Sequence, residues 1–444
     1  MKRFFKWTGF LLLGILLMFL LWYYVKDPAV TLAEPKNVSV QFEGAFLALS
    51  DADMVATGYV DGKTKKLPGL SDTLSYIEAV NGTMKITKSH FASNSVISWP
   101  AVLEWHTEFQ YAYIAETRAA LKNPNATFKD VFADFPTGEV ISVIDFSKDQ
   151  PQLLQTKTVG KNIQGVSINA KRDLIAFGST EQGKELGIAF LEEGLLQDIH
   201  YFSHRDILPL ATNNSGIRTV EFHPTKNILA VNLNNTHLVY YEVKIENHTL
   251  RAIELGKPIE VAKRWSVGNW HPSGDFFILS DVAWGNGVLG AIVNNPGYLV
   301  SVAFDRSTKN EVISKVKVDL GPEGADISPD GKYAIAVNMR RTYVPSEGYG
   351  FVNAKAFSSL TLVKIDVNSG VLRRLGDHYG FEGALPEDAI FDKESNSIAV
   401  AVYHAIENPE AGWIDFWEII DDRLVYTGQK IKVTRGVHNL LLID

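Results

Sequence analysis

Short apolar runs separated by turn residues recur along the chain from about residue 90 to its end. Most of these runs have the length of a strand, and few show the 3.6-residue periodicity of a helix. Five segments share one pattern, in which a strand, a tight turn and a strongly apolar strand follow one another. They begin at Ile163, Ile217, Trp265, Pro322 and Pro386. The pattern predicts an all-β protein built from repeated hairpins.

The spacing of these segments indicates the architecture. Their starting points lie 54, 48, 57 and 64 residues apart, and Val437 opens a related strand 51 residues after the last of them. A less regular copy begins at Ser93. Periods of about 40 to 60 residues in all-β material are typical of a propeller, in which each period forms one four-stranded blade.

Counting the periods predicts seven blades. Residues 38–92 are numerous enough to supply the outer strands of a blade whose innermost strand is Val437–Ile443. Pairing of the N- and C-terminal strands would remove the exposed sheet edges of an open ring. Eight blades remain an alternative, because residues 38–50 could hold an extra strand. The other six blades begin near Asn94, Gln164, Arg218, Ser266, Glu323 and Glu387.

The N-terminal segment resembles a membrane anchor. Trp7–Val25 is a run of 19 residues without a charge, preceded by three basic residues, and about 20 apolar residues span a bilayer core of about 30 Å. The sequence therefore predicts a transmembrane signal-anchor over residues 1–26, a tether over 27–37 and a propeller over 38–444. The leading positive charges predict a single-pass protein with a cytoplasmic N-terminus. The propeller would be extracytoplasmic, and periplasmic in a Gram-negative host. A cleaved signal peptide is the alternative.

Composition and charge narrow the function classes. The chain has no cysteine, which excludes disulfides, thiolate metal sites, cysteine nucleophiles and covalently attached haem, and so disfavours an electron-transfer propeller. The first 26 residues are basic, and the rest carries a net charge of −12, which disfavours nucleic acid as a partner. Gly285–Gly290 matches the glycine spacing of a dinucleotide-binding fingerprint. It falls between two strands rather than in a βαβ unit, which disfavours nucleotide binding. No cofactor and no metal are expected.

The repeat register places polar residues at one mouth of the central channel, where the innermost strand of each blade begins. An Arg, a His and two carboxylates are not required there for folding, so we interpret this mouth as a candidate ligand site. The alternative is a water-filled pore with a polar lining. The residues in equivalent positions are Asn94 or Ser95, Gln164, Arg218, Ser266, Glu323, Glu387 and His438.

Long loops open on the same face as this mouth. They cover residues 117–138, 281–297, 340–357 and 404–412, and long loops on a rigid scaffold commonly carry binding sites. Arg340, Arg341 and Tyr343 give the face a cationic and aromatic character that suits an acidic or sugar-like ligand. Alternatively, these loops only pack over one another.

One turn carries a family resemblance. Pro329-Asp330-Gly331-Lys332, followed by the apolar strand 333–338, resembles the signature of YVTN-type propellers, a superfamily that includes seven-bladed lactonases. Weaker copies cover residues 223–232 and 271–279, whereas the Trp-Asp strand ends of WD40 repeats are missing. The motif is structural and says nothing about chemistry by itself.

The resemblance implies a second hypothesis for the mouth, since propeller lactonases place a Glu, a His and an Arg around the channel. By position, Glu323 or Glu387 would then be the general base, Arg218 would hold an oxyanion or a substrate carboxylate, and His438 would protonate the leaving alkoxide.

Two functions therefore remain open. One is a membrane-anchored module that binds a small molecule or a protein partner through Arg218, Gln164, Ser266, Arg340, Arg341 and Tyr343. The other is a lactonase-like hydrolase. Convergence of the mouth residues on one pocket is the feature that would favour chemistry.

Overall fold

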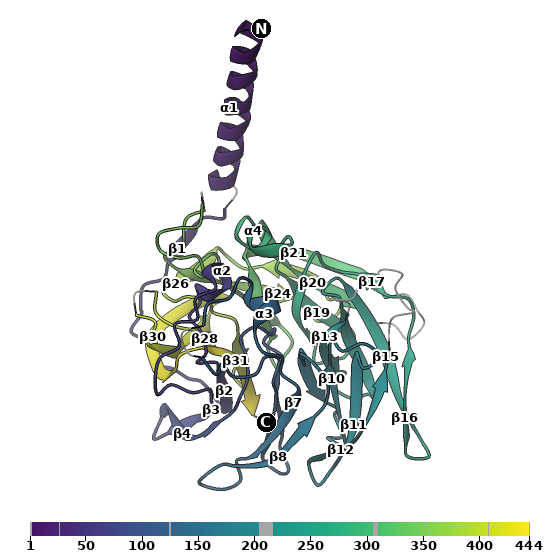
Figure 1. Cartoon of the computed structure of the whole chain (residues 1–444). Coiled ribbons are helices and arrows are strands. Elements are labelled where there is room, and N and C mark those ends of the chain that lie inside the picture. The colour runs from purple at the N-terminus through teal and green to yellow at the C-terminus, as the bar shows by residue number, and fades with distance from the viewer. Residues whose placement is uncertain are drawn as a thin grey trace.

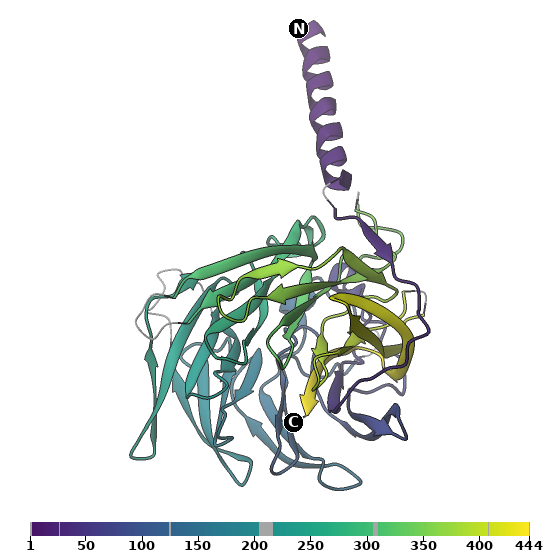
Figure 2. The same cartoon turned by 180° about the vertical axis from the view of Figure 1, so that it is seen from behind.

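The computed structural model describes residues 2–25, 27–123, 126–203, 216–304, 310–350, 352–406 and 408–443, with the side chains of the N-terminal helix described over residues 7–20. These residues form seven sheets arranged around a central channel (Figures 1 and 2). The prediction of an all-β, seven-bladed propeller is confirmed.

Blades 1 to 6 follow one another along the chain, and each begins with its innermost strand. Blade 1 holds β5 (Leu103–His106), β6 (Tyr111–Ala115), β7 (Val140–Asp145) and β8 (Gln152–Thr158). Blade 2 holds β9 (Gly165–Ile168), β10 (Leu174–Gly178), β11 (Leu186–Glu192) and β12 (Leu195–Phe202). Blade 3 holds β13 (Ile217–Phe222), β14 (Ile228–Leu233), β15 (His237–Glu246) and β16 (Thr249–Glu254), with β17 (Ile259–Glu260) added to β15.

The remaining blades complete the ring. Blade 4 holds β18 (Trp265–Trp270), β19 (Phe276–Asp281), β20 (Pro296–Ala303) and β21 (Val312–Leu320). Blade 5 holds β22 (Pro322–Ile327), β23 (Tyr333–Asn338), β24 (Ser358–Ile365), β25 (Leu372–Arg374), β26 (His378–Phe381) and β1 (Val30–Leu32). Blade 6 holds β27 (Ala389–Phe391), β28 (Ser397–Val402), β29 (Ala411–Ile420) and β30 (Arg423–Thr434). Blade 7 holds β31 (Val437–Ile443), β2 (Ala45–Ser50), β3 (Thr73–Val80) and β4 (Thr83–Phe91).

The ring is closed by the two ends of the propeller sequence. β31 pairs antiparallel with β2, from Ala45 opposite Ile443 to Ser50 opposite Val437. The seven innermost strands contact one another in a continuous circle, and β31 contacts both β27 and β5. The second strand of each repeat is the most apolar and is buried on both faces, as Ile228–Leu233 shows. Its burial between neighbouring blades forms the core.

The N-terminal helix α1 (Lys2–Val25) projects away from the propeller (Figures 1 and 2). In the described part of the chain, no helix has both the length and the apolar character needed to cross a membrane. The prediction of a single-pass membrane anchor, and of a location derived from it, is therefore wrong by this criterion.

The segment after α1 is held against the propeller. β1 pairs parallel with β26, from Val30 opposite His378 to Leu32 opposite Gly380. Asp27 forms ion pairs with the buried Arg341 and with Lys355 at 2.9 Å. These contacts hold residues 27–33 against blade 5, and β1 is the edge strand of its sheet.

Three short helices lie in loops at one end of the channel (Figure 1). They are α2 (Gly58–Asp61), α3 (Val131–Asp134) and α4 (Gly287–Ile292). Side chains from all three loops share one apolar cluster with Trp284, Tyr343 and Leu385. Apolar residues of these long loops therefore pack over one another and partly roof the channel mouth.

Candidate functional site

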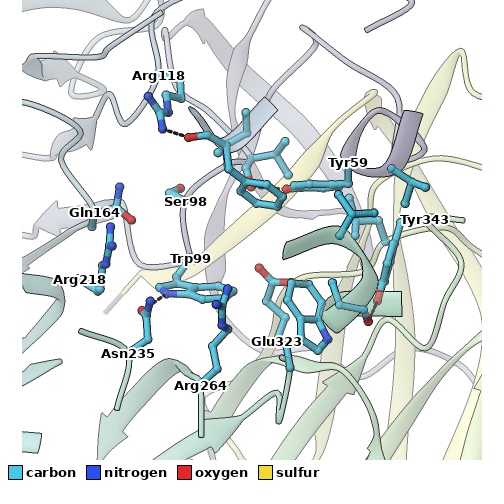
Figure 3. Close-up of a pocket in the computed structure, with 18 of the residues that line it drawn as sticks. Tyr59, Ser98, Trp99, Arg118, Gln164, Arg218, Asn235, Arg264, Glu323 and Tyr343 are labelled. Carbon is cyan, nitrogen blue, oxygen red and sulfur yellow. Dashed lines mark hydrogen bonds between the residues drawn. The ribbon is translucent and has the colours of Figure 1, made fainter. Parts of the chain in front are cut away.

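A cavity of about 270 Å³ lies at this mouth of the channel (Figure 3). It is lined by four residues that the sequence singled out, namely Gln164, Arg218, Glu323 and Tyr343. Gln164 lies directly before β9, while Arg218 and Glu323 lie near the starts of β13 and β22. Three blades thus contribute to the site through the ends of their innermost strands, which only the closed ring brings together.

One side of the cavity is cationic. Arg118, Arg218 and Arg264 all line it and come from blades 1, 3 and 4. Burial, together with the neighbouring charges of Arg264 and Arg118, lowers the pKa of Arg218 to about 10. Burial also lowers the pKa values of Arg118 and Arg264. All three remain protonated at neutral pH, so the cavity favours an anionic group.

Arg118 also connects the cavity to the loop that carries α3. Its guanidinium donates hydrogen bonds to the backbone carbonyls of Phe132 and Phe135, the latter at 3.3 Å. Phe132 stacks on Tyr59 of α2, with ring centroids 5.3 Å apart. Both rings line the cavity, so α2 and α3 together form part of its wall.

Glu323 supplies the carboxyl group of the cavity. Figure 3 shows it across the cavity from Gln164 and Arg218. Burial raises the pKa of Glu323 to about 8. The carboxyl is therefore mostly protonated at pH 7 and becomes a base as the pH rises through that value.

Glu387 and His438 lie behind the cavity wall rather than in it. Both side chains are fully buried, and Nδ1 of His438 is 3.9 Å from Oε2 of Glu387. Oε1 of Glu387 faces the Tyr59 hydroxyl at 3.4 Å, and Nε2 of His438 is 2.8 Å from Oδ1 of Asn94. Burial and the nearby Glu323 raise the pKa of Glu387, while burial lowers the pKa of His438 to about 3. His438 is thus neutral at physiological pH, and Glu387 holds its proton more tightly than an ordinary carboxyl does.

Aromatic side chains complete the lining. The Trp99 indole donates a hydrogen bond from Nε1 to Oδ1 of Asn235 at 2.9 Å. The Tyr59 hydroxyl donates to the carbonyl of Val96 at 2.6 Å, and that of Tyr343 donates to the carbonyl of Ala291 at 3.0 Å. These bonds hold the rings in fixed positions, which leaves apolar faces beside the charged groups.

Three predicted binding residues do not line the cavity. Ser266 is buried, and its hydroxyl donates to the carbonyl of Glu323 at 2.6 Å. Arg340 is buried in an ion pair with Asp319, whereas Arg341 is buried against Asp27 of the N-terminal segment. The two arginines of the 340–357 loop therefore compensate internal carboxylates, because burial of an unpaired charge is costly. Of the three residues assigned to this loop, only Tyr343 reaches the cavity.

Several cavity residues were not identified from the sequence. Arg264 lies two positions before Ser266, so a wider window at the start of each blade would have included it. Arg118 belongs to the long 117–138 loop, and Trp99 lies in the irregular first repeat. Tyr59 could not be identified from the repeat pattern, because its segment precedes the repeats.

A second cavity of about 220 Å³ lies deeper in the channel. Its lining includes residues that come further along the innermost strands. Burial raises the pKa of Glu104 to about 7 and that of Asp326 to about 6, and it raises those of Glu221 and Asp388 as well. The two cavities thus differ in their ionisable groups: three arginines and one carboxyl line the mouth cavity, and four carboxyls line the deeper one.

Three further carboxyls, Asp51, Asp53 and Asp72, have oxygens within 4.8 Å of one another. These oxygens accept hydrogen bonds from the backbone N–H groups of residues 52, 53, 94, 96 and 121. Asp53 also forms an ion pair with Lys66. The cluster therefore ties together the loops beside the mouth, and its oxygens are already engaged without a metal ion.

Comparisons with known proteins find the fold but no family. No family model matches the chain, and no curated protein matches it. A proposed 6-phosphogluconolactonase from Bacteroides uniformis superimposes with a TM-score of 0.60 at 17% identity, covering 91% of this chain and 100% of its own. A proposed 6-phosphogluconolactonase from Bacteroides fragilis gives a TM-score of 0.59 at 16% identity, with coverages of 92% and 100%. A periplasmic gluconolactonase from Pseudomonas aeruginosa gives 0.57 at 12%, with coverages of 90% and 99%. At such identities the likeness establishes a shared propeller fold.

Proposed function

We propose that the channel-mouth cavity is the active site of a lactonase-like hydrolase that acts on a small anionic lactone. One observation carries the proposal: a single cavity gathers the Glu323 carboxyl and the guanidinium groups of Arg118, Arg218 and Arg264. The shared fold with proteins named as gluconolactonases and proposed 6-phosphogluconolactonases supports this reaction class over binding alone.

The residues suggest a division of roles. Ionised Glu323 would remove a proton from water, and the resulting hydroxide would add to the lactone carbonyl carbon. Guanidinium groups of the cationic side would stabilise the negative oxygen of the tetrahedral intermediate and hold an anionic substituent. Collapse would break the ring C–O bond, and the protonated Glu323 would return its proton to the leaving alkoxide. The product is the open-chain hydroxy acid.

This proposal differs from the sequence hypothesis in two residues. The described geometry keeps His438 away from the cavity and engages its Nε2 with Asn94. Glu387 reaches the cavity wall only through the Tyr59 hydroxyl. Between the two candidate bases, Glu323 is therefore the one we assign, because it alone lines the cavity.

A pH-stat assay of lactone opening tests the proposal, with gluconolactone and 6-phosphogluconolactone as substrates and spontaneous opening subtracted. We expect the wild-type protein to accelerate opening and Glu323→Gln to lose at least about 100-fold in kcat, the usual range for a general base. The matched control is Glu394→Gln, an exposed carboxylate on blade 6 that should leave the rate unchanged. Arg264→Gln should raise KM for the phosphorylated lactone.

The pH dependence provides a second test. Since the pKa of Glu323 is raised to about 8, about a tenth of this carboxyl is ionised at pH 7. The rate should therefore rise with pH and level off above about 8. No acceleration with either lactone, in a protein that binds these anions, would instead favour a binding module.

A further inference from the structure

The first blade departs from the others at the channel mouth. In the other six blades the innermost strand begins within two residues of its mouth residue, whereas β5 begins at Leu103, nine residues after Asn94. The intervening residues form turns, with Ser98 N–H donating to Ser95 at 3.3 Å and Ala101 N–H donating to Trp99 at 2.7 Å. This segment therefore crosses the channel instead of extending the blade.

The crossing segment separates the two cavities. Residues 96–99 line the mouth cavity, and Pro100 and Ala101 line the deeper one. Trp99 also packs against the cluster that contains Val267 and Ala325 of the innermost strands β18 and β22. The Trp99 indole thus forms a floor between the two cavities.

The position of this indole is fixed from another blade. Its Nε1–H donates to Oδ1 of Asn235, 136 residues away in the turn between β14 and β15. Asn234 and Asn235 both have positive φ values, of 57° and 60°, as the two central positions of a type I′ turn require, and this turn is closed by Thr236 N–H donating to the carbonyl of Leu233 at 3.2 Å. Figure 3 shows Trp99 between Arg218 and Asn235 on one side and Glu323 on the other.

We propose that Trp99 is the platform by which this cavity selects a cyclic anion over an open-chain anion with the same number of non-hydrogen atoms. A flat ring can contact the rigid indole with its whole face, whereas an open chain must first freeze several rotatable bonds. A ring placed on Trp99 can direct an anionic substituent to the arginines and a carbonyl to Glu323. The inference rests on the proposed function in placing the ligand in this cavity, and it names cyclic substrates as the preferred class.

The test measures binding without catalysis. Pyroglutamate is a cyclic amide with one carboxylate, and N-acetylalaninate has the same number of non-hydrogen atoms, an amide and one carboxylate in an open chain. Neutral 2-pyrrolidone keeps the ring and lacks the charge. Dissociation constants for the three probes are measured by ligand-observed NMR on the full chain.

We expect pyroglutamate to bind the wild-type protein at least about fivefold more tightly than N-acetylalaninate and about tenfold more tightly than 2-pyrrolidone. Trp99→Leu should reduce the ring preference to below twofold while leaving the affinity for N-acetylalaninate within twofold. Trp413→Leu, which changes an indole on β29 that is outside the cavity lining, is the matched control and should keep the preference.

A second variant isolates the hydrogen bond. Asn235→Gly keeps a residue that tolerates a positive φ but removes the acceptor for Trp99, so the ring preference should fall without a change in fold. If Trp99→Leu does not fold, Asn235→Gly alone tests the ring preference. Equal affinities of the wild-type protein for the ring and the chain, or an unchanged preference in both variants, would overturn the inference. Ring preference without lactone opening would reject the proposed hydrolysis alone, and lactone opening without ring preference would reject the platform alone.

Discussion

Asn94 determines the tautomer of the buried His438. Its Nδ2 donates to the carbonyls of Ser50 at 3.0 Å and Ala92 at 2.7 Å, so Oδ1 is the atom that faces Nε2 of His438. Because an amide oxygen only accepts, Nε2 carries the hydrogen. Nδ1 then carries a lone pair and faces the carboxyl of Glu387 at 3.9 Å. The pair is a buried polar link between β31 and blade 6 rather than a proton relay to the cavity.

This tautomer predicts the effect of His438→Ala. The substitution removes a fully buried side chain and leaves Oδ1 of Asn94 without its donor, which should cost about 2–4 kcal/mol of stability. The melting temperature should fall by several °C, while the pH dependence of lactone opening by the folded protein should keep its shape. An unchanged melting temperature with a lost rate would assign His438 to the chemistry instead.

The sequence predicted the mouth residues only as far as strand register allowed. Aligning the repeats identified Gln164, Arg218 and Glu323, which line the cavity. The pairing register shifts near the starts of β13, β18 and β22, between Ile217 and Val220, Trp265 and Gly268, and Pro322 and Gly324. Such bulges re-aim side chains. In blade 4 the short Ser266 side chain is buried against the carbonyl of Glu323, and the cavity receives Arg264 from two positions earlier.

At the scale of the elements, each hairpin turn fastens one blade to the next. Nε2 of His223 in blade 3 is 3.1 Å from the carbonyl of Gly274 in blade 4, and Nε2 of His271 is 3.0 Å from the carbonyl of Gly331 in blade 5. The repeated turn motif thus has an inter-blade role, which explains why a structural signature recurs without carrying chemistry.

Gly331→Ala tests this fastening. Gly331 has a φ of 74°, and an added Cβ would lie 2.4 Å from Nε2 of His271. The matched control is Gly82→Ala, because Gly82 has a φ of 73° with no atom within 4 Å of the added Cβ. Both variants should lose about 1 kcal/mol from the positive φ. Gly331→Ala should lose about 1–3 kcal/mol more from the clash, measured as the difference in urea midpoints. Equal urea midpoints for the two variants would show that the turn at Gly331 does not pack tightly against His271 of blade 4.

Regular elements were predictable from the sequence, and irregular ones were not. The repeat period located the innermost strands of blades 2 to 7, because turn residues separate the apolar runs of each repeat. The period cannot predict β1, whose three residues gain their partners only from β26, nor the late start of β5. Both depend on contacts between distant segments, which local patterning does not encode.

At the scale of the whole molecule, stability depends on closing the ring. β31 pairs with β2, and Asn439 on β31 also accepts from Val102 N–H and donates to Asp388. One strand therefore connects blades 6, 7 and 1. Deleting residues 437–444 should give an insoluble or grossly destabilised protein, because it removes apolar burial worth about 25 cal/mol per Å² and leaves exposed sheet edges. A soluble truncated protein with the melting temperature of the full chain would show another mode of closure.

Buried carboxyls give the propeller a characteristic pH dependence. Burial raises the pKa values of Asp51, Glu104 and Asp415 to about 7 and that of Glu323 to about 8. The same groups titrate near pH 4 in an unfolded chain. The folded state thus holds more protons than the unfolded state between these values, and stability falls as the pH rises. Buried histidines with lowered pKa values oppose this trend only below about pH 6.5, where the unfolded chain takes up their protons.

The window from pH 6.5 to 8.5 therefore isolates the carboxyl contribution. In that window we expect the melting temperature to fall steadily by a few °C, because the carboxyls with pKa values of about 7 to 8 lose their protons in the folded state there, whereas they are already ionised in the unfolded chain. Asp415→Asn should make the fall shallower, since its fully buried carboxyl, 3.4 Å from Lys430, no longer has a proton to lose. The exposed control Glu394→Gln should leave the slope unchanged. Calorimetric scans of the three proteins across this window measure the slopes. A melting temperature that rises between pH 6.5 and 8.5 would mean that these carboxyls are ionised in the folded protein.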